Sequence, residues 1–511
     1  MQRAIAFTLC LTLAAAGCGP WVSAGAQSVY STVPPPTTAP PPPIDTLPPV
    51  SVQSPLPDLG DPAQAGLSLQ AEKKIGESVM REYRRDPDFV DDPEVVSYVN
   101  TVGQRLVAVS ADAGREFEFF VVRDNTINAF AMPGGFVGVH TGLLLAAQTE
   151  SELAGVLAHE ISHVTQRHIA RQLEKGSQLS WAAIAGLVVA VLAARSNPQA
   201  SQAAMAGTQA GAIQAMLNYS RDFEREADRV GFTLMEAAGY DPNGMPAFFE
   251  RLQRATRLAE LNAAPAYLRT HPLTEERMAD LQARASAVHY RQRSDSVDFY
   301  LVRAKLRAQD GAPPEAVKAF ENQLKEGRYA NEGAAHYGLA TALLRARNFK
   351  RAESELSIAR TETGPHPMLE TLGARIKRDS GDLAGARDQL TRALKDFGQR
   401  TYLVYEYAET LQALNAHREA ITVLDKLVRE RPHDARAYQM LAKSHAALGH
   451  IAWQHRAQGE YYALSGSLPA AIEQMQLAQR AGDGDFYLLS SVDARLRELK
   501  VLDADERKAK R

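Results

Sequence analysis

Alanine recurs at a fixed interval along the C-terminal half of the chain. Two series share a step of 34 residues, and each member of the second follows one of the first by 12 residues: Ala340, Ala374, Ala408 and Ala442, then Ala352, Ala386 and Ala420. A repeat of this length is typical of an α-solenoid, in which each helical unit packs against its neighbours. The alternative is an unrelated helical bundle in which the alanines coincide by chance. It is the weaker interpretation, because four positions keep the same interval.

The length of the unit indicates the type of repeat. A 34-residue unit with small side chains in both helices resembles the tetratricopeptide repeat, in which those residues let paired helices approach closely. Ala304 and Ala316 keep the 12-residue offset one unit earlier, and Gly459 with Ala471 suggests a last, irregular copy. We therefore expect a tetratricopeptide-repeat domain over residues 291–511.

The composition limits what the rest of the chain does. With 511 residues, two or three domains are expected. The cysteines are Cys10 and Cys18, which excludes a disulfide framework, a cysteine-ligated zinc site and a thiol enzyme in the body of the protein. A formal net charge of -3 gives no electrostatic reason to expect nucleic acid as a partner.

The N-terminus has the pattern of an export signal. Arg3 precedes an apolar stretch that is too short to span a bilayer, and Ala24-Gly25-Ala26 offers a cleavage site, so residues 1–26 are predicted to be a signal peptide. The alternative is lipoprotein processing, which would leave a lipid on Cys18. Residues 27–60 form a linker, because eleven prolines between positions 34 and 57 prevent a helical or sheet core.

Residues 61–290 have the pattern of a mixed domain. Helices are predicted at 67–80, 92–109, 149–173 and 220–238, and strands at 117–122, 128–131 and 135–139. The apolar run 179–194 is too short to cross a hydrocarbon core. It is interpreted as a lid, with a buried hairpin or a membrane-contacting plug as alternatives. Residues 199–217 are rich in alanine and glycine.

A five-residue motif within the predicted helix 149–173 carries the chemistry. His159 and His163 are four residues apart, so they share one face of the helix and can bind one metal ion. Glu160 is turned about 100° away, where it can reach a water molecule instead of the metal. Apolar neighbours imply that this helix is buried, which makes surface histidines an unconvincing interpretation.

A catalytic zinc site needs a third protein ligand. His168 lies five residues beyond His163, about 140° around the same helix, and is expected to support the site or to lie on the surface. Glu224 and Asp228 share one helix face, so that one carboxylate can bind the metal while the other accepts a ring N–H of a ligand histidine. Taken alone, this pair would be an exposed charged face.

These motifs, together with Asn128-Ala129-Phe130-Ala131 before Pro133-Gly134-Gly135, resemble the zinc endopeptidase family that contains the CaaX prenyl proteases. The likeness extends over residues 57 to 500 and is strongest to a periplasmic member with tetratricopeptide repeats. It implies a mainly α chain: an α+β, gluzincin-type metalloprotease domain over 61–290, followed by the α-solenoid.

The same resemblance assigns residue roles. It implies one zinc ion per chain on His159, His163 and Glu224, with Glu160 as general base and Asp228 as a catalytic support residue. His271, in Thr270-His271-Pro272, would be a fourth, regulatory ligand that suppresses activity by filling the open position on the zinc.

The resemblance also implies a function. It indicates a periplasmic zinc endopeptidase that degrades misfolded or stalled outer-membrane proteins, with repeats that contact such clients or the β-barrel assembly machinery. The alternative is a chaperone or scaffold whose metal site is inactive or blocked. A membrane-spanning prenyl protease is disfavoured, because the chain lacks long apolar segments.

Overall fold

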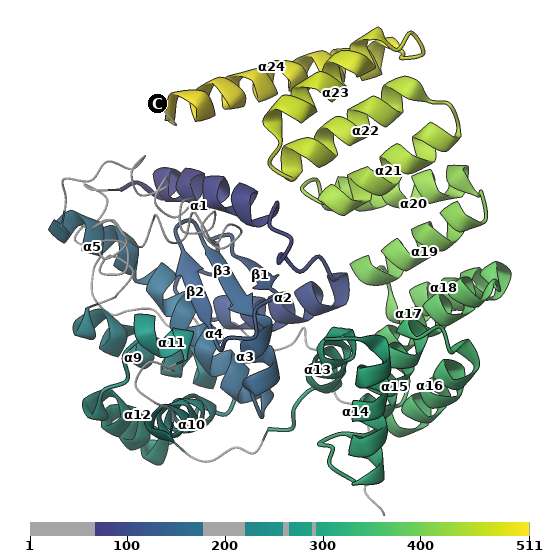
Figure 1. Cartoon of the computed structure of the whole chain (residues 1–511). Helices are drawn as coiled ribbons and strands as arrows, with labels where there is room; N and C mark the ends of the chain where they lie inside the picture. The colour runs from purple at the N-terminus through teal and green to yellow at the C-terminus, as the bar shows by residue number, and fades with distance from the viewer. Residues whose placement is uncertain (1–66, 177–219, 259–264, 289–292, 510–511) are drawn as a thin grey trace, which may run out of the picture. The chain divides into compact units, whose positions relative to one another are not determined.

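The computed structural model describes residues 67–176, 220–258, 265–288 and 293–509. The predicted signal peptide and linker, Cys18, and the runs 179–194 and 199–217 lie outside these ranges. The described part is mainly helical with one small sheet, followed by a series of helical pairs (Figure 1). This arrangement confirms the predicted fold class.

Two amphipathic helices open the described chain. Helix α1 covers Leu69–Tyr83 and helix α2 covers Pro93–Val107, close to the ranges that the hydrophobic pattern predicts. The side chains of Ser68 and Asp92 cap the first turns by accepting backbone N–H groups. The apolar side of α2 packs against the sheet.

The sheet has three strands in the order β1-β3-β2: β1 Glu118–Val122, β2 Ala129–Met132 and β3 Phe136–His140. Strand β3 is central, parallel to β1 and antiparallel to β2. Gly134 and Gly135 have φ angles of 86° and 90° in the β2–β3 turn, a conformation that favours glycine. Within the described sheet, β2 is therefore an edge strand.

Helix α4 is the centre of this part of the core. It covers Glu150–Thr165 after the short helix α3 (Thr141–Ala146), and all of its residues up to Val164 are buried. The Thr149 hydroxyl caps its N-terminus by accepting the N–H of Glu152. Helix α4 packs against β2, which places the histidine motif beside the edge strand (Figure 1).

The prediction of one helix over 149–173 was wrong, because the chain breaks after α4. Arg167 has a φ of 52°, and a new helix, α5, covers His168–Gly176. The guanidinium of Arg167 donates to the backbone oxygen of Leu67 and to the carboxylate of buried Glu72. These charge-assisted bonds offset the cost of about 1–2 kcal/mol for a left-handed residue.

Four further helices are described in the first domain: α9 Arg221–Ala237, α10 Gly244–Leu258, α11 Ala266–Thr270 and α12 Glu275–Ala287. Helix α9 crosses α4 closely at Gly231. A Cβ atom on Gly231 would lie 3.1 Å from the backbone of Ala158 and His159. The glycine thus lets α9 bring its carboxylates up to the histidines.

The predicted solenoid is present as α13 to α24, drawn as successive pairs in Figure 1. All seven alanines of the two series are buried. Gly459 and Ala471 lie on adjacent helices, where Met475 packs against Gly459. The bounds are α13 Val297–Gln309, α14 Pro313–Lys325, α15 Glu332–Arg345, α16 Phe349–Thr363, α17 Pro367–Ser380, α18 Leu383–Phe397, α19 Thr401–Ala413, α20 His417–Glu430, α21 Ala435–Ala447, α22 Ile451–Leu464, α23 Leu468–Arg480 and α24 Phe486–Ala509.

The first repeat helix shares the core of the preceding domain. Helix α13 packs against α2 and α3, and its Lys305 is buried against the carboxylates of Asp92 and Glu94. The boundary at 290/291 stays a prediction.

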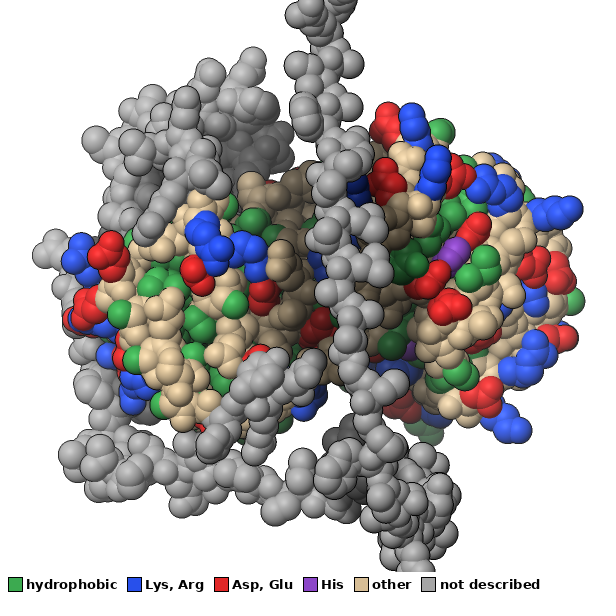
Figure 2. All heavy atoms as spheres, turned by 90° about the horizontal axis from the view of Figure 1, so that it is seen from below, with side chains coloured by type: hydrophobic (Ala, Val, Ile, Leu, Met, Phe, Trp, Pro, Cys, Tyr) green, Lys and Arg blue, Asp and Glu red, His purple; other side chains and the backbone are tan. Residues whose placement is uncertain are grey.

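The surface carries both signs of charge. In Figure 2, acidic and basic side chains are interspersed over the visible described surface. Among the described helices, none combines the length and the apolar character that crossing a bilayer requires.

Candidate metal centre

Four side chains from three separate segments of the chain meet at one point. His159, His163, Glu224 and His271 are all buried and each offers one ligand atom, and these atoms lie within 4.8 Å of one another. They come from α4, from α9 and from the residue that ends α11. The sequence motif and the carboxylate on α9 are therefore brought together, and His271 joins them.

The spacing of these atoms fits a tetrahedral zinc ion. With ligand bonds of 2.0–2.1 Å, neighbouring ligand atoms should be about 3.3 Å apart. His159 Nε2 lies 3.0 Å from His163 Nε2 and 3.3 Å from His271 Nδ1. Glu224 Oε1 lies 3.0 Å from His271 Nδ1 and 3.5 Å from His163 Nε2. Two or three imidazoles with one carboxylate are also the donor set that zinc prefers.

Asp228 holds His159 from the side away from the cluster. Its Oδ1 lies 3.0 Å from His159 Nδ1, so it accepts the ring N–H and leaves Nε2 free for a metal. Arg277 fixes the carboxylate in turn, with Nε and Nη2 donating to its two oxygens at 2.6 and 2.8 Å. Arg277 Nη1 also reaches Glu224 Oε2 at 2.8 Å.

The charges around the cluster call for a cation. Three carboxylates (Glu160, Glu224 and Asp228) are buried at the cluster, and the one guanidinium, Arg277, pairs with Glu224 and Asp228, which leaves an excess of negative charge that a divalent ion can neutralise. Burial alone would lower the pKa of His159, but hydrogen bonds to Asp228 and Glu224 outweigh it and raise that pKa to about 9. The carboxylates of the site therefore stabilise a positive charge on His159 as well.

Glu160 is buried next to the cluster but is not one of its four potential ligands. Its Oε1 lies 3.5 Å from His271 Nε2, and a hydrogen bond from the backbone of Ala131 in β2 favours its charged form. Burial is the main cause of a raised pKa of Glu160. A buried carboxylate with a raised pKa beside a metal site is suited to exchanging protons with a water molecule there.

His271 is held in the cluster by its own segment. Its ring stacks on Tyr267, with centroids 4.6 Å apart and planes at 25°. Its backbone N–H donates to the Tyr267 carbonyl. The N–H of Tyr267 donates to the carbonyl of Ile127, just before β2, at 3.2 Å. The segment that carries His271 thus adjoins the start of the edge strand.

Two residues of this arrangement escape the sequence patterns. Arg277 lies six residues after His271 and contacts both α9 carboxylates, but no spacing pattern marks it. For Tyr267, the only signal in the sequence is its position four residues before His271, which is compatible with a stacked pair on one helix face. His168 lies outside the cluster, but it is fully buried behind His163.

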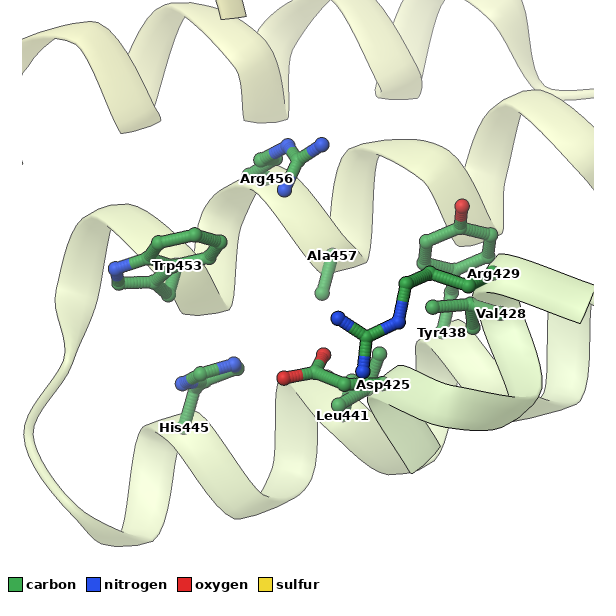
Figure 3. Close-up of a pocket in the computed structure, with 9 residues that line it drawn as sticks. All are labelled: Asp425, Val428, Arg429, Tyr438, Leu441, His445, Trp453, Arg456 and Ala457. Carbon is green, nitrogen blue, oxygen red and sulfur yellow. The ribbon is translucent and has the colours of Figure 1, made fainter. Parts of the chain in front are cut away.

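The described repeats contain a separate pocket. A cavity of 310 Å³ opens between α20, α21 and α22, with Trp453, Arg456 and Arg429 around Asp425 (Figure 3). Trp453 stacks on His445 and lies under the Arg456 guanidinium. The lining belongs to the repeats and shares no residue with the metal cluster.

Comparison with known proteins identifies the family. Residues 93–285 match the model of peptidase family M48, and residues 377–444 match that of the tetratricopeptide repeat. The chain is 35% identical to the putative beta-barrel assembly-enhancing protease of Vibrio cholerae over 89% of its own length and 94% of the relative's. The chain belongs to peptidase family M48.

Other relatives support this family assignment. The beta-barrel assembly-enhancing protease of Escherichia coli is 32% identical over 88% of this chain and 91% of its own. The mitochondrial metalloendopeptidase OMA1 of Schizosaccharomyces pombe is 34% identical over 42% of this chain and 61% of its own. The M48 chain described here is therefore a zinc metallopeptidase with tetratricopeptide repeats, and the expected metal and enzyme class are confirmed.

Proposed function

We propose that this M48 peptidase is a periplasmic endopeptidase that cleaves misfolded or stalled outer-membrane proteins and assists their assembly through its repeats. The observation that carries the proposal is the similarity along nearly the whole chain to beta-barrel assembly-enhancing proteases, combined with an intact metal cluster. The repeats, with the pocket between α20 and α22, would contact the client or the assembly machinery.

The proposal assigns a role to each residue of the cluster. His159, His163 and Glu224 would hold zinc, which when bound lowers the pKa of a water molecule toward 7 and polarises the substrate carbonyl. Glu160 would remove the proton from the attacking water and deliver it to the leaving amine. Asp228, fixed by Arg277, would keep His159 in the tautomer that binds metal.

Substrate binding would use the edge strand. Strand β2 pairs only with β3 in the described sheet, and α4 packs against it beside the cluster. An extended substrate can add to such an edge through main-chain hydrogen bonds, which are largely independent of side-chain identity. Recognition of this kind suits clients that are unfolded.

The ligand assignment predicts the zinc content of variants. The purified chain should carry about one zinc ion, because a catalytic zinc site is formed by three protein ligands, here two histidines and one carboxylate. His159→Ala, His163→Ala and Glu224→Ala should each lose it, because each change removes one of the three side chains proposed to hold the ion. Elemental analysis after dialysis measures this, with His336→Ala, which lies in the repeats, as the control that keeps its zinc. Zinc retained by Glu224→Ala would assign the third ligand elsewhere.

The client assignment predicts a difference between two states of one substrate. An outer-membrane β-barrel protein that is diluted from urea into buffer without detergent, and so stays unfolded, should be cut into fragments. The same protein folded in detergent micelles should stay intact. The closed barrel offers no free strand edge to the enzyme. Electrophoresis of both samples over time is the measurement, and equal cleavage of the two states would contradict recognition through an added strand.

A further inference from the structure

The second zinc-ligand histidine has a buried partner behind it. His168 has no exposed surface, and its Nδ1 lies 2.8 Å from Nδ1 of His163. On its other side, His168 Nε2 lies 3.2 Å from Oε2 of Glu226. His163 therefore faces the cluster with Nε2 and faces His168 with Nδ1.

The break between α4 and α5 makes this contact possible. On one continuous helix, His168 would point about 140° away from His163. Because Arg167 adopts a left-handed conformation, α5 starts afresh at His168 and turns its ring back toward α4. Phe223, at the start of α9, stacks flat on the His168 ring, with centroids 4.5 Å apart and planes at 12°.

The positions of the protons follow from these contacts. A metal on Nε2 of His163 needs the lone pair of that nitrogen, so the ring hydrogen of His163 is on Nδ1. That N–H can donate only if Nδ1 of His168 accepts, and the hydrogen of His168 is then on Nε2. This second N–H donates to the Glu226 carboxylate, which Arg171 Nη1 also contacts at 2.9 Å.

We propose that His168 is a positioning residue for the zinc site, which sets the tautomer and orientation of His163 and is itself held by Glu226. The two ligand histidines of α4 then have parallel supports. His159 donates directly to the carboxylate of Asp228, which Arg277 holds. His163 donates to His168, which passes the same constraint to Glu226 and Arg171.

The proposal predicts weaker zinc binding without a change of ligands. His168→Leu removes the acceptor for His163 at similar volume, and the zinc dissociation constant should rise 10- to 100-fold. His168→Asn places an oxygen close to the position of Nδ1, so it should recover most of the affinity. Competition with a chromophoric chelator measures the affinity, and the thermal unfolding of the zinc-free chain measures packing separately.

The matched control is a histidine–carboxylate pair away from the metal. His336 lies 2.7 Å from Glu355 in the repeats, so His336→Leu should leave zinc affinity unchanged. An unchanged affinity in His168→Leu would overturn the proposal. The proposal would also be overturned if the Leu and Asn variants lost zinc affinity equally and their zinc-free chains lost thermal stability equally. That result would indicate that His168 acts through packing alone. The inference rests on the proposed ligand set: a wild-type chain that binds no zinc would overturn that set as well.

Discussion

Glu160→Gln is expected to lower kcat/KM for an unfolded protein substrate by a factor of about 10² to 10⁴ while leaving the zinc content at the wild-type level. Glutamine has the shape of glutamate but cannot take a proton. The backbone N–H of Ala131, which donates to the carboxylate, can donate equally to an amide oxygen, so the replacement keeps that contact. Casein cleavage and elemental analysis on the same preparation measure the two quantities.

An exposed glutamate on α9 provides the control. Glu236→Gln makes the same chemical change 76 residues further along the chain, on the solvent side of α9, and should retain full activity. If Glu160→Gln kept its activity with zinc bound, another group would have to be the base. If it lost activity but preserved every cellular role of the protein, the chaperone or scaffold alternative would be favoured.

The second large effect is expected from His271→Ala, which should raise proteolysis. With His271 in place, the cluster offers four ligand atoms, which would be the closed arrangement of structural zinc sites, whereas a catalytic site keeps one position open. If the open state is populated to about 10% or less, removal of the imidazole should raise the cleavage rate about tenfold or more. Peptide cleavage at constant zinc content measures this.

Two further observations decide whether His271 acts as a plug. The His271→Ala change should have no effect in the Glu160→Gln background, because opening a site without its base restores no chemistry. Tyr267→Ala should raise proteolysis to a smaller extent, because the stacked ring that orients His271 is lost while the imidazole remains. Unchanged or lower cleavage by His271→Ala with zinc intact would eliminate the plug and indicate a role in binding substrate.

Helical periodicity explains which parts of the site could be predicted from the sequence. His159 and His163, like Glu224 and Asp228, are four residues apart, so each pair shares a helix face wherever the helix is placed. The buried surroundings of α4 also follow from its apolar neighbours. Local spacing therefore predicts two halves of a site, and the family resemblance was needed to join them.

The remaining features depend on contacts between distant segments. The end of α4 is set by Arg167, a non-glycine residue in a left-handed conformation whose partner Glu72 lies 95 residues earlier, and no local pattern signals that. The prediction that His168 points away from His163 assumed one continuous helix, and it fails because the helix ends at this break. The alanine period, in contrast, predicted the repeats well, because each repeat contacts its sequence neighbours.

The metal cluster has a consequence for how this fold is held together. His159 and His271 are 112 residues apart, and Glu224 lies 47 residues before His271. An ion bound by these groups cross-links α4, α9 and the end of α11, closing long loops as a disulfide would. The chain has cysteines only at positions 10 and 18, so it cannot use disulfides there. Zinc held by these groups would therefore be a cross-link that does not depend on the redox state of the compartment, so that metal supply, not thiol oxidation, would control it.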